Sequence, residues 1–177
     1  MLIMKKIIAT TALTLLFVTL SFAQIPLAGS WMMKQTVMGT TVADYLTFDN
    51  DAQGSANNKI TIDFKFKMLG VKAEGKAEIS VSGTFVTDGD KLTINWDQES
   101  LSVNSTPIVM SYGGEVIDEG KEEFEGMLDE IVADIRSEIE KNAVDEYFDV
   151  RVKGNRLSLT SLDEKGKKET EKFSRVQ

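Results

Sequence analysis

Residues 59–68 read KITIDFKFKM, in which apolar and polar side chains alternate without a break. A period of two predicts a β-strand with one buried and one solvated face. The same alternation resumes in residues 71–81, directly after Leu69 and Gly70. Two alternating runs about a two-residue connection predict a β-hairpin.

Both faces of this hairpin agree on one register. Folding the chain about Leu69 and Gly70 places large apolar side chains opposite small ones on the inner face, and lysines opposite acids on the outer face. The predicted pairs are Phe66–Ala73, Phe64–Gly75, Lys65–Glu74 and Asp63–Lys76. Cross-strand pairs of opposite charge contribute roughly 0.2–1 kcal/mol each, so the charges favour the register that the apolar face selects.

Further alternating runs are separated by turn residues along the rest of the chain. Residues 84–86 and 91–96 flank Asp88-Gly89, and residues 148–152 and 157–159 flank Gly154-Asn155. Such consecutive hairpins predict a mainly β chain, folded as an antiparallel up-and-down β-barrel of about 8–10 strands, because a closed barrel leaves no exposed sheet edge. A two-sheet sandwich is the structural alternative.

Between residues 115 and 142 the apolar period changes to that of an α-helix. Apolar side chains recur at three- and four-residue spacing from Phe124 to Ile139, which predicts one long amphipathic helix inserted between the late strands. Its polar face is acidic, with eleven acids and three bases from Glu115 to Lys141. The simplest interpretation of these acids is that they form the solvated face of the helix. More specific interpretations are that the helix caps the mouth of the barrel, or that its acidic face is a docking surface for a cationic protein partner.

The composition excludes several classes of function. The 177 residues contain no histidine and no cysteine, so disulfides, thiolate nucleophiles, Ser-His-Asp triads and histidine-ligated zinc are excluded. The net charge is −8, which argues against nucleic-acid binding because phosphates attract the opposite charge. Most of this negative charge falls between Glu115 and Lys141, and the rest of the chain is nearly balanced.

The N-terminal segment has the three parts of a secretory signal. Lys5 and Lys6 precede an apolar run over residues 7–20, and small residues stand at Ser21 and Ala23. We therefore expect a signal peptide at 1–23 and a single domain at 24–177, exported to a periplasm or the extracellular space. The apolar run is short for a bilayer span, so we expect no membrane insertion. Without a cysteine at the cleavage position, we expect a soluble protein and not a lipoprotein.

Short motifs give the chain a family resemblance. Gly29-Ser30-Trp31 opens the first predicted strand, residues 83–94 contain a hairpin GTF…GDKLTI, and Phe173-Ser174-Arg175 closes the last strand. Together these motifs resemble lipocalin-like domains of secreted bacterial proteins, which are calycin-type β-barrels. The resemblance implies that Gly29, Trp31 and Arg175 close one end of the barrel, with the arginine packed across the tryptophan ring. The chain departs from lipocalins in placing its helix before three further strands.

The predicted inner face is almost wholly apolar. We expect it to bind a small apolar ligand through Phe64, Phe66, Met68, Phe85, Trp96, Met110 and Tyr112. These side chains could equally fill the barrel, because a barrel of this size either packs solid or holds one small ligand.

Motifs for metal binding and catalysis are weak. Asp49–Gly54 begins like a calcium loop, but Ile60 stands where a bidentate glutamate is required, so we interpret it as a turn and expect no metal or cofactor. A carboxylate-dependent glycan hydrolase is a third hypothesis, after the binding protein and a cell-envelope interaction module that docks through the helix. No residue pattern singles out a catalytic pair, so we expect no enzyme activity.

Overall fold

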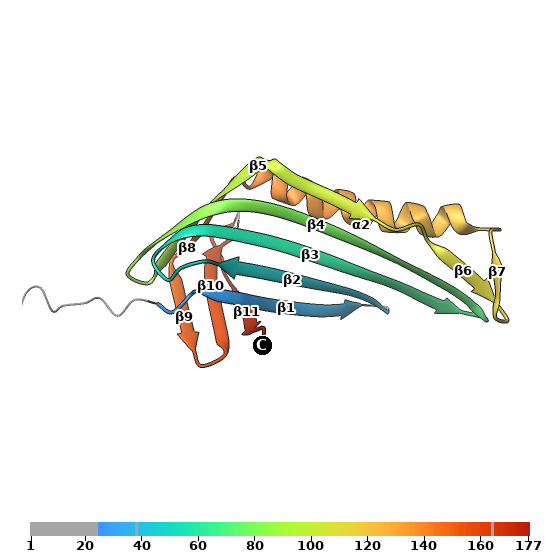
Figure 1. The fold of residues 1–177 in the computed structure, drawn as a ribbon, viewed down its shortest axis with the longest axis horizontal. Coiled ribbons are helices and arrows are strands. Elements are labelled where there is room, and N and C mark those ends of the chain that lie inside the picture. The colour runs from blue at the N-terminus through green and yellow to red at the C-terminus, as the bar shows by residue number, and fades with distance from the viewer. Residues whose placement is uncertain (1–24, 38, 164) are drawn as a thin grey trace, which may run out of the picture.

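The computed structural model describes residues 25–37, 39–163 and 165–177, so the expected signal peptide lies outside the described part. The described residues form an 11-stranded antiparallel sheet and one helix, α2 (Figure 1). The strands are β1 (Gly29–Val37), β2 (Thr40–Phe48), β3 (Gln53–Met68), β4 (Val71–Asp88), β5 (Lys91–Ser105), β6 (Val109–Tyr112), β7 (Glu115–Ile117), β8 (Val144–Tyr147), β9 (Asp149–Lys153), β10 (Arg156–Leu162) and β11 (Lys168–Arg175). The helix spans Lys121–Lys141, within the predicted insertion at 115–142, but Glu115–Ile117 at the start of that insertion form the strand β7 instead.

The paired strands do not close into the predicted barrel. Their order is β7-β6-β4-β3-β2-β1-β11-β10-β9, with β5 paired to β4 and β8. Among the described strands, the sheet is open between β8, which pairs with β5, and β9, which pairs with β10. The central strands are also longer than predicted. β3, β4 and β5 contain 16, 18 and 15 residues, where the turn pattern had suggested several shorter strands. These strands curve together at one end of the molecule and continue at the other as a flat arm (Figure 1).

The predicted hairpin registers are confirmed. β3 and β4 pair Phe66 with Ala73 and Phe64 with Gly75, and β9 and β10 pair Val152 with Leu157. Lys65 is opposite Glu74 as predicted, but its ammonium lies 2.8 Å from Asp63 on its own strand.

The apolar inner face forms two separate clusters. The curved-end cluster centres on Trp31, Phe48, Phe85, Leu92 and Phe173. The arm cluster lies between the extended parts of β3 and β4 and the helix, and includes Ile62, Phe64, Ile79 and Met110. The helix is therefore the second layer of the arm, because the flat sheet there has no opposing strands to cover it.

The apolar stripe of α2 faces this arm cluster. Leu128 is the buried residue of the helix, and Phe124, Ile131, Val132, Ile135 and Ile139 pack partly buried around it. Its charged side chains include two i,i+4 ion pairs, Lys121–Glu125 at 3.4 Å and Arg136–Glu140 at 2.7 Å. Exposed pairs of this kind stabilise a helix only slightly, so burial of the stripe holds α2 in place. Among the described residues, no helix is both long and apolar enough to cross a membrane.

Gly126→Ala is expected to raise the free energy of unfolding by about 1 kcal/mol, because glycine is the poorest helix former after proline. A Cβ at Gly126 would meet no atom within 4 Å, so no clash offsets this gain. Urea unfolding measures the change. Gly120→Ala is the matched control: Gly120 has φ +80°, which an alanine adopts only with strain, so this variant should be less stable than the unmodified protein. Equal effects of both substitutions would contradict the prediction.

Candidate functional site

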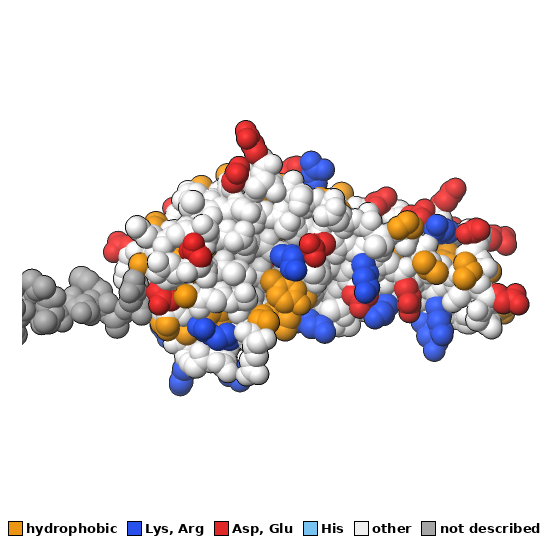
Figure 2. All heavy atoms as spheres, in the orientation of Figure 1, with side chains coloured by type: hydrophobic (Ala, Val, Ile, Leu, Met, Phe, Trp, Pro, Cys, Tyr) orange, Lys and Arg blue, Asp and Glu red, His pale blue; other side chains and the backbone are white. Residues whose placement is uncertain are grey.

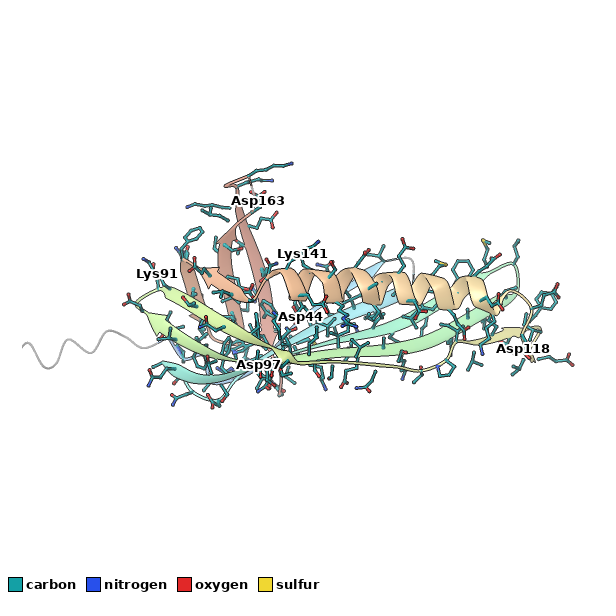
Figure 3. The ribbon with its side chains drawn as sticks, turned by 90° about the horizontal axis from the view of Figure 1, so that it is seen from above. Asp44, Lys91, Asp97, Asp118, Lys141 and Asp163 are labelled. Carbon is teal, nitrogen blue, oxygen red and sulfur yellow. The ribbon has the colours of Figure 1, made fainter. Side chains whose placement is uncertain are left out.

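A cavity of about 1370 Å³ lies at the curved end of the sheet. Its walls come from the inner faces of β2, β3, β4 and β5, from β8, from the β10–β11 hairpin and from the C-terminal turn of α2. Figure 3 shows Asp44 near the end of α2 marked by Lys141, with the hairpin marked by Asp163 projecting away from the sheet. The cavity therefore lies where the arm, the hairpin and the helix meet.

Three carboxylates project into this space from different strands. Asp44 stands on β2 between Val42 and Leu46, and strand alternation places all three on the inner face. By the same alternation Asp145 shares a face of β8 with Tyr147, and Glu171 of β11 precedes Phe173 by two residues. Pleating thus brings acids from the beginning and the end of the chain into one cavity.

Each of these carboxylates accepts one hydrogen bond from a neighbouring side chain. Asn58 Nδ2 donates to Asp44 Oδ1 at 2.6 Å, and Trp96 Nε1 donates to Asp145 Oδ2 at 2.7 Å. Tyr147 donates its hydroxyl hydrogen to Glu171 Oε2 at 3.4 Å. An ionised carboxylate can accept about four hydrogen bonds, so these donors orient the groups and leave capacity for a ligand.

Burial raises the pKa values of all three carboxyl groups, and repulsion from neighbouring carboxylates adds to the shifts. Burial raises the pKa of Asp44 to about 6, with a further contribution from the charge of Asp145, against the lowering effect of the Asn58 hydrogen bond. Burial also raises the pKa values of Asp145 and Glu171, and Asp44 adds to the shift of Glu171. The pKa of Tyr147 is raised well above its ordinary value, first by burial and then by Glu171, so this phenol stays protonated at neutral pH.

The cavity has a strong excess of negative charge. Seven acids line it, Asp44, Glu138, Asp145, Glu146, Asp163, Glu169 and Glu171, against two bases, Lys91 and Lys165. Within the described part of the chain, Asp44, Asp145 and Glu171 form no salt bridge. No group of three or more acids among the described residues is arranged to hold a metal ion. The electrostatic field in the cavity therefore favours a cation over an anion.

Apolar and aromatic side chains form most of the remaining walls, beside Asn58, Thr93, Asn142 and Ser161. Leu46, Val81, Leu92, Trp96, Ile139, Val144, Tyr147, Phe148, Leu162 and Phe173 contribute to them. Gly83 on β4 is opposite Trp96 on β5, and a Cβ there would clash with the Asn95 carbonyl oxygen and lie 3.0 Å from the indole ring. A glycine at this position lets Trp96 lie close against the sheet, so one aromatic wall depends on the missing side chain.

The structure distributes the seven predicted ligand-binding residues over four places. Trp96 lines the cavity. Phe64, Phe66 and Met110 belong to the arm cluster, where Phe66 lies 5.0 Å from Phe124 of the helix between ring centroids. Phe85 is buried in the curved-end cluster, with its ring centroid 4.8 Å from that of Phe48. Met68 and Tyr112 are more than half exposed at the far tip of the arm. The period of two identified their shared face, but that face spans two cores and an exposed tip.

The three residues named by the lipocalin resemblance do lie together. Trp31 of β1 is fully buried and pairs with Arg175 of β11, whose guanidinium carbon lies 4.4 Å from the centroid of the indole ring. Arg175 also donates to the carbonyl of Pro26, at 3.2 Å. Gly29 has φ +117°, and a Cβ there would approach Arg175 to 3.3 Å. This is the contact that the resemblance implies.

Sequence reasoning missed the acids of the cavity. The signal was present, because Asp44 is in phase with Val42, Leu46 and Phe48, and Glu171 is in phase with Phe173. A charged residue in phase with a buried face is costly unless it has partners or a function. The acidic residues of the chain are thus concentrated in two places, the helix and the cavity. Outside the helix, acidic and basic side chains are not evenly distributed over the molecule.

Comparison with known proteins gives no match. No protein-family model, no curated protein and no solved structure matches the chain. The lipocalin likeness therefore rests on short motifs alone, and the chemistry of the cavity is the basis for assigning a function.

Proposed function

We propose that this protein is a non-catalytic binding protein that holds a small amphipathic molecule in the cavity at the curved end of the sheet. The ligand has an apolar body and a protonated amine. The observation that carries this proposal is the combination of about 1370 Å³ of space, aromatic walls and three half-buried carboxylates, Asp44, Asp145 and Glu171. The amine refines the expectation of a purely apolar ligand.

The size of the cavity supports a ligand rather than trapped water alone. Ligand sites typically enclose roughly 300–1,000 Å³, less than the about 1370 Å³ of this cavity, and combine apolar walls with a few placed polar groups. In this cavity Trp96, Tyr147 and Phe173 supply apolar surface, while the carboxylates supply acceptors.

The charge of the cavity supports a cation. Two opposite unit charges 4 Å apart attract by about 1 kcal/mol in water and about 4 kcal/mol at the effective dielectric near a protein surface. A bound ammonium group would offset the mutual repulsion that raises the pKa values of Asp44 and Glu171. An anionic ligand such as a fatty acid would add to that repulsion.

We further propose that the curved end acts as a lipocalin-like container although its ladders are open. Phe148 N donates to Thr160 O at 3.0 Å, and Val150 N donates to Asp90 O at 2.8 Å. These two bonds tie the β8–β9 run to β10 on one side and to the β4–β5 turn on the other. Export, expected from residues 1–23, would place this container in a periplasm or outside the cell.

A matched series of probes tests the ligand class. Decylamine, decanol and decanoate share one tail and differ in charge, and isothermal titration calorimetry at pH 7.5 gives the Kd of each. We expect decylamine to bind at least about tenfold more tightly than decanol, and decanoate to bind weakest, because a tenfold change corresponds to about 1.4 kcal/mol. Equal affinities, tightest binding of decanoate, or no binding of any probe would overturn the proposal.

Asp44→Asn provides the matched variant. It preserves an acceptor for Asn58 and removes the charge, so the preference for decylamine should shrink about tenfold while decanol binding stays unchanged. Asp134→Asn is the control, because it makes the same chemical change on an exposed position of α2. If Asp134→Asn reduced the preference as much, general charge and not the cavity would explain the binding.

A further inference from the structure

A second cavity, of about 430 Å³, lies on the face of the sheet that points away from α2. Strand alternation directs its side chains to this outer face, because their neighbours along the strands, such as Trp31, Leu46 and Ile79, are buried on the inner one. The C-terminal segment borders it, where Val176 N donates to Ser30 O at 2.8 Å. We call it the outer cavity. Short polar side chains line much of it, among them Ser30, Thr47, Asn57, Ser80 and Ser82.

The outer face changes in character along the two longest strands. On the arm, every outward side chain of β3 and β4 between residues 63 and 76 is charged, apart from the turn. Toward the curved end, none of the outward side chains at residues 53–57 and 80–86 is charged, although the chain as a whole is 27% charged. Figure 2 shows this face, with many charged side chains over the arm and few over the central strands of the curved end. An uncharged face costs less to desolvate than a charged one, so this part of the sheet is suited to contact with a ligand.

Hydrogen bonds hold the short side chains of the outer cavity in place. Ser30 Oγ and Thr47 Oγ1 lie 2.9 Å apart, and Ser82 Oγ donates to Asn57 Oδ1 at 2.9 Å. The hydroxyls retain acceptor capacity, and the Asn57 amide nitrogen donates to no described residue. The outer cavity therefore offers both donors and acceptors, which are ordered before a ligand binds.

The longer side chains add an aromatic ring without adding net charge. Lys59 Nζ lies 5.7 Å from the ring centroid of Tyr45 and 3.7 Å from Glu78 Oε2. Among the described side chains that line the outer cavity, Lys59 is the one base and Glu78 the one acid, so their charges cancel. Tyrosine, serine and asparagine are residues that antibody combining sites favour, because tyrosine gives a rigid amphipathic surface and the small side chains give adaptable hydrogen bonds.

We propose that the outer cavity binds a neutral oligosaccharide. Such a ligand has hydroxyls that donate and accept hydrogen bonds, as the serines, Thr47 and Asn57 do, and C–H faces that pack on the ring of Tyr45. The volume lies within the roughly 300–1,000 Å³ typical of ligand sites, and sheet faces bind oligosaccharides in other folds. Nucleic acids and acidic glycans would require an excess of basic side chains, and a purely apolar ligand would leave the hydroxyls unpaired. The site is independent of the amine-binding cavity, which lies on the inner face.

Sugars of matched length test the ligand class. Maltohexaose, cellohexaose and N-acetylchitohexaose are neutral, whereas hexagalacturonate has the same number of rings and is acidic. Isothermal titration calorimetry at pH 7.5 gives the Kd of each. We expect at least one neutral hexasaccharide to bind with a Kd of about 1 mM or lower, and about tenfold more tightly than hexagalacturonate. Binding of none of the three neutral sugars, or binding of hexagalacturonate at least as tight as theirs, would overturn the proposal.

Tyr45→Ala tests whether the sugar binds at the outer cavity. The variant lacks the aromatic ring, so its affinity for the hexasaccharide should fall at least about tenfold. Asn57→Ala changes an exposed side chain and should weaken binding about fivefold by removing one hydrogen-bonding group. Tyr112→Ala is the matched control, because it removes another tyrosine ring, which is 58% exposed on the arm. Circular dichroism confirms the fold of each variant.

The outcomes separate this site from the amine-binding cavity. Tyr45 does not line that cavity, so Tyr45→Ala should bind decylamine as the unmodified protein does. Failure of the decylamine series would therefore leave the oligosaccharide site standing. An unchanged hexasaccharide affinity in both Tyr45→Ala and Asn57→Ala, or an equal loss in Tyr112→Ala, would remove the sugar from the outer cavity and overturn the proposal.

Discussion

Asp44→Asn is expected to stabilise the protein at pH 7.5 by about 3 kcal/mol, because an asparagine has no charge to bury. The pKa of Asp44 rises from 3.8 to about 6 on folding, so the native state holds this proton more tightly than the unfolded chain does. The stability that this proton gives is present in full below pH 4, decreases as the pH rises to about 6, and is absent above it. The Asp44→Asn variant escapes this loss, so the two proteins should differ little at pH 4 and most above pH 6.

Urea unfolding at several pH values measures this difference. For a domain of this size, about 3 kcal/mol corresponds to a rise in Tm of roughly 6–12 °C. Removing the charge of Asp44 should also lower the pKa of Glu171, which Asp44 raises, so the gain at neutral pH includes relief of that repulsion. Asp134→Asn, on the exposed face of α2, should leave the pH profile unchanged. A stability difference between Asp44→Asn and the unmodified protein that is independent of pH would contradict the assignment.

The expected gain connects stability to function. A carboxylate that weakens the fold at neutral pH is explicable if a ligand cation compensates for it when bound. Decylamine should therefore raise the Tm of the unmodified protein more than that of Asp44→Asn, because the variant has already lost the repulsion that the amine would offset.

Local patterns predicted the local structure well and the closure of the sheet poorly. The register of β3 with β4 follows from side-chain alternation and charge pairing, and α2 follows from the apolar stripe between Phe124 and Ile139. Whether strands close into a barrel depends on their lengths and on where along a strand its pairing partner changes. β4 pairs with β5 along one part and with β6 along another, and no local pattern encodes that change.

The candidate site was missed because its residues are polar exceptions in apolar strands. Trp96 was predicted from its place in an alternating run, and it lines the cavity. Asp145 and Tyr147 stand on a strand of four residues, too short to give a period, and the pairing of that strand with β5 spans a distant part of the chain. The cavity is produced by the tertiary arrangement of β8, α2 and the β10–β11 hairpin, so its acids come together only after folding.

Trp31→Ala is expected to lower the free energy of unfolding by about 3–5 kcal/mol, a large share of the roughly 5–15 kcal/mol that holds a domain together. The side chain is fully buried, its indole nitrogen donates to the Leu27 carbonyl at 2.7 Å, and its ring lies under the Arg175 guanidinium. The substitution leaves a cavity where β1 meets β11. Two residue pairs join these strands, and they connect the β1–β4 part of the sheet to the β9–β11 part.

Trp96→Ala is the matched comparison for Trp31→Ala, because Trp96 is the other tryptophan of the chain and lies half-buried against open space in the cavity. We expect it to cost about 1–2 kcal/mol of stability and to weaken probe binding instead. A double-mutant cycle with Trp31→Leu and Arg175→Met, which remove the aromatic ring and the positive charge, should then give a coupling of about 0.5–2 kcal/mol for the ring–guanidinium contact. Equal destabilisation by Trp31→Ala and Trp96→Ala would contradict the structural role of Trp31, because a side chain facing an open cavity leaves fewer contacts to lose than one enclosed on every side.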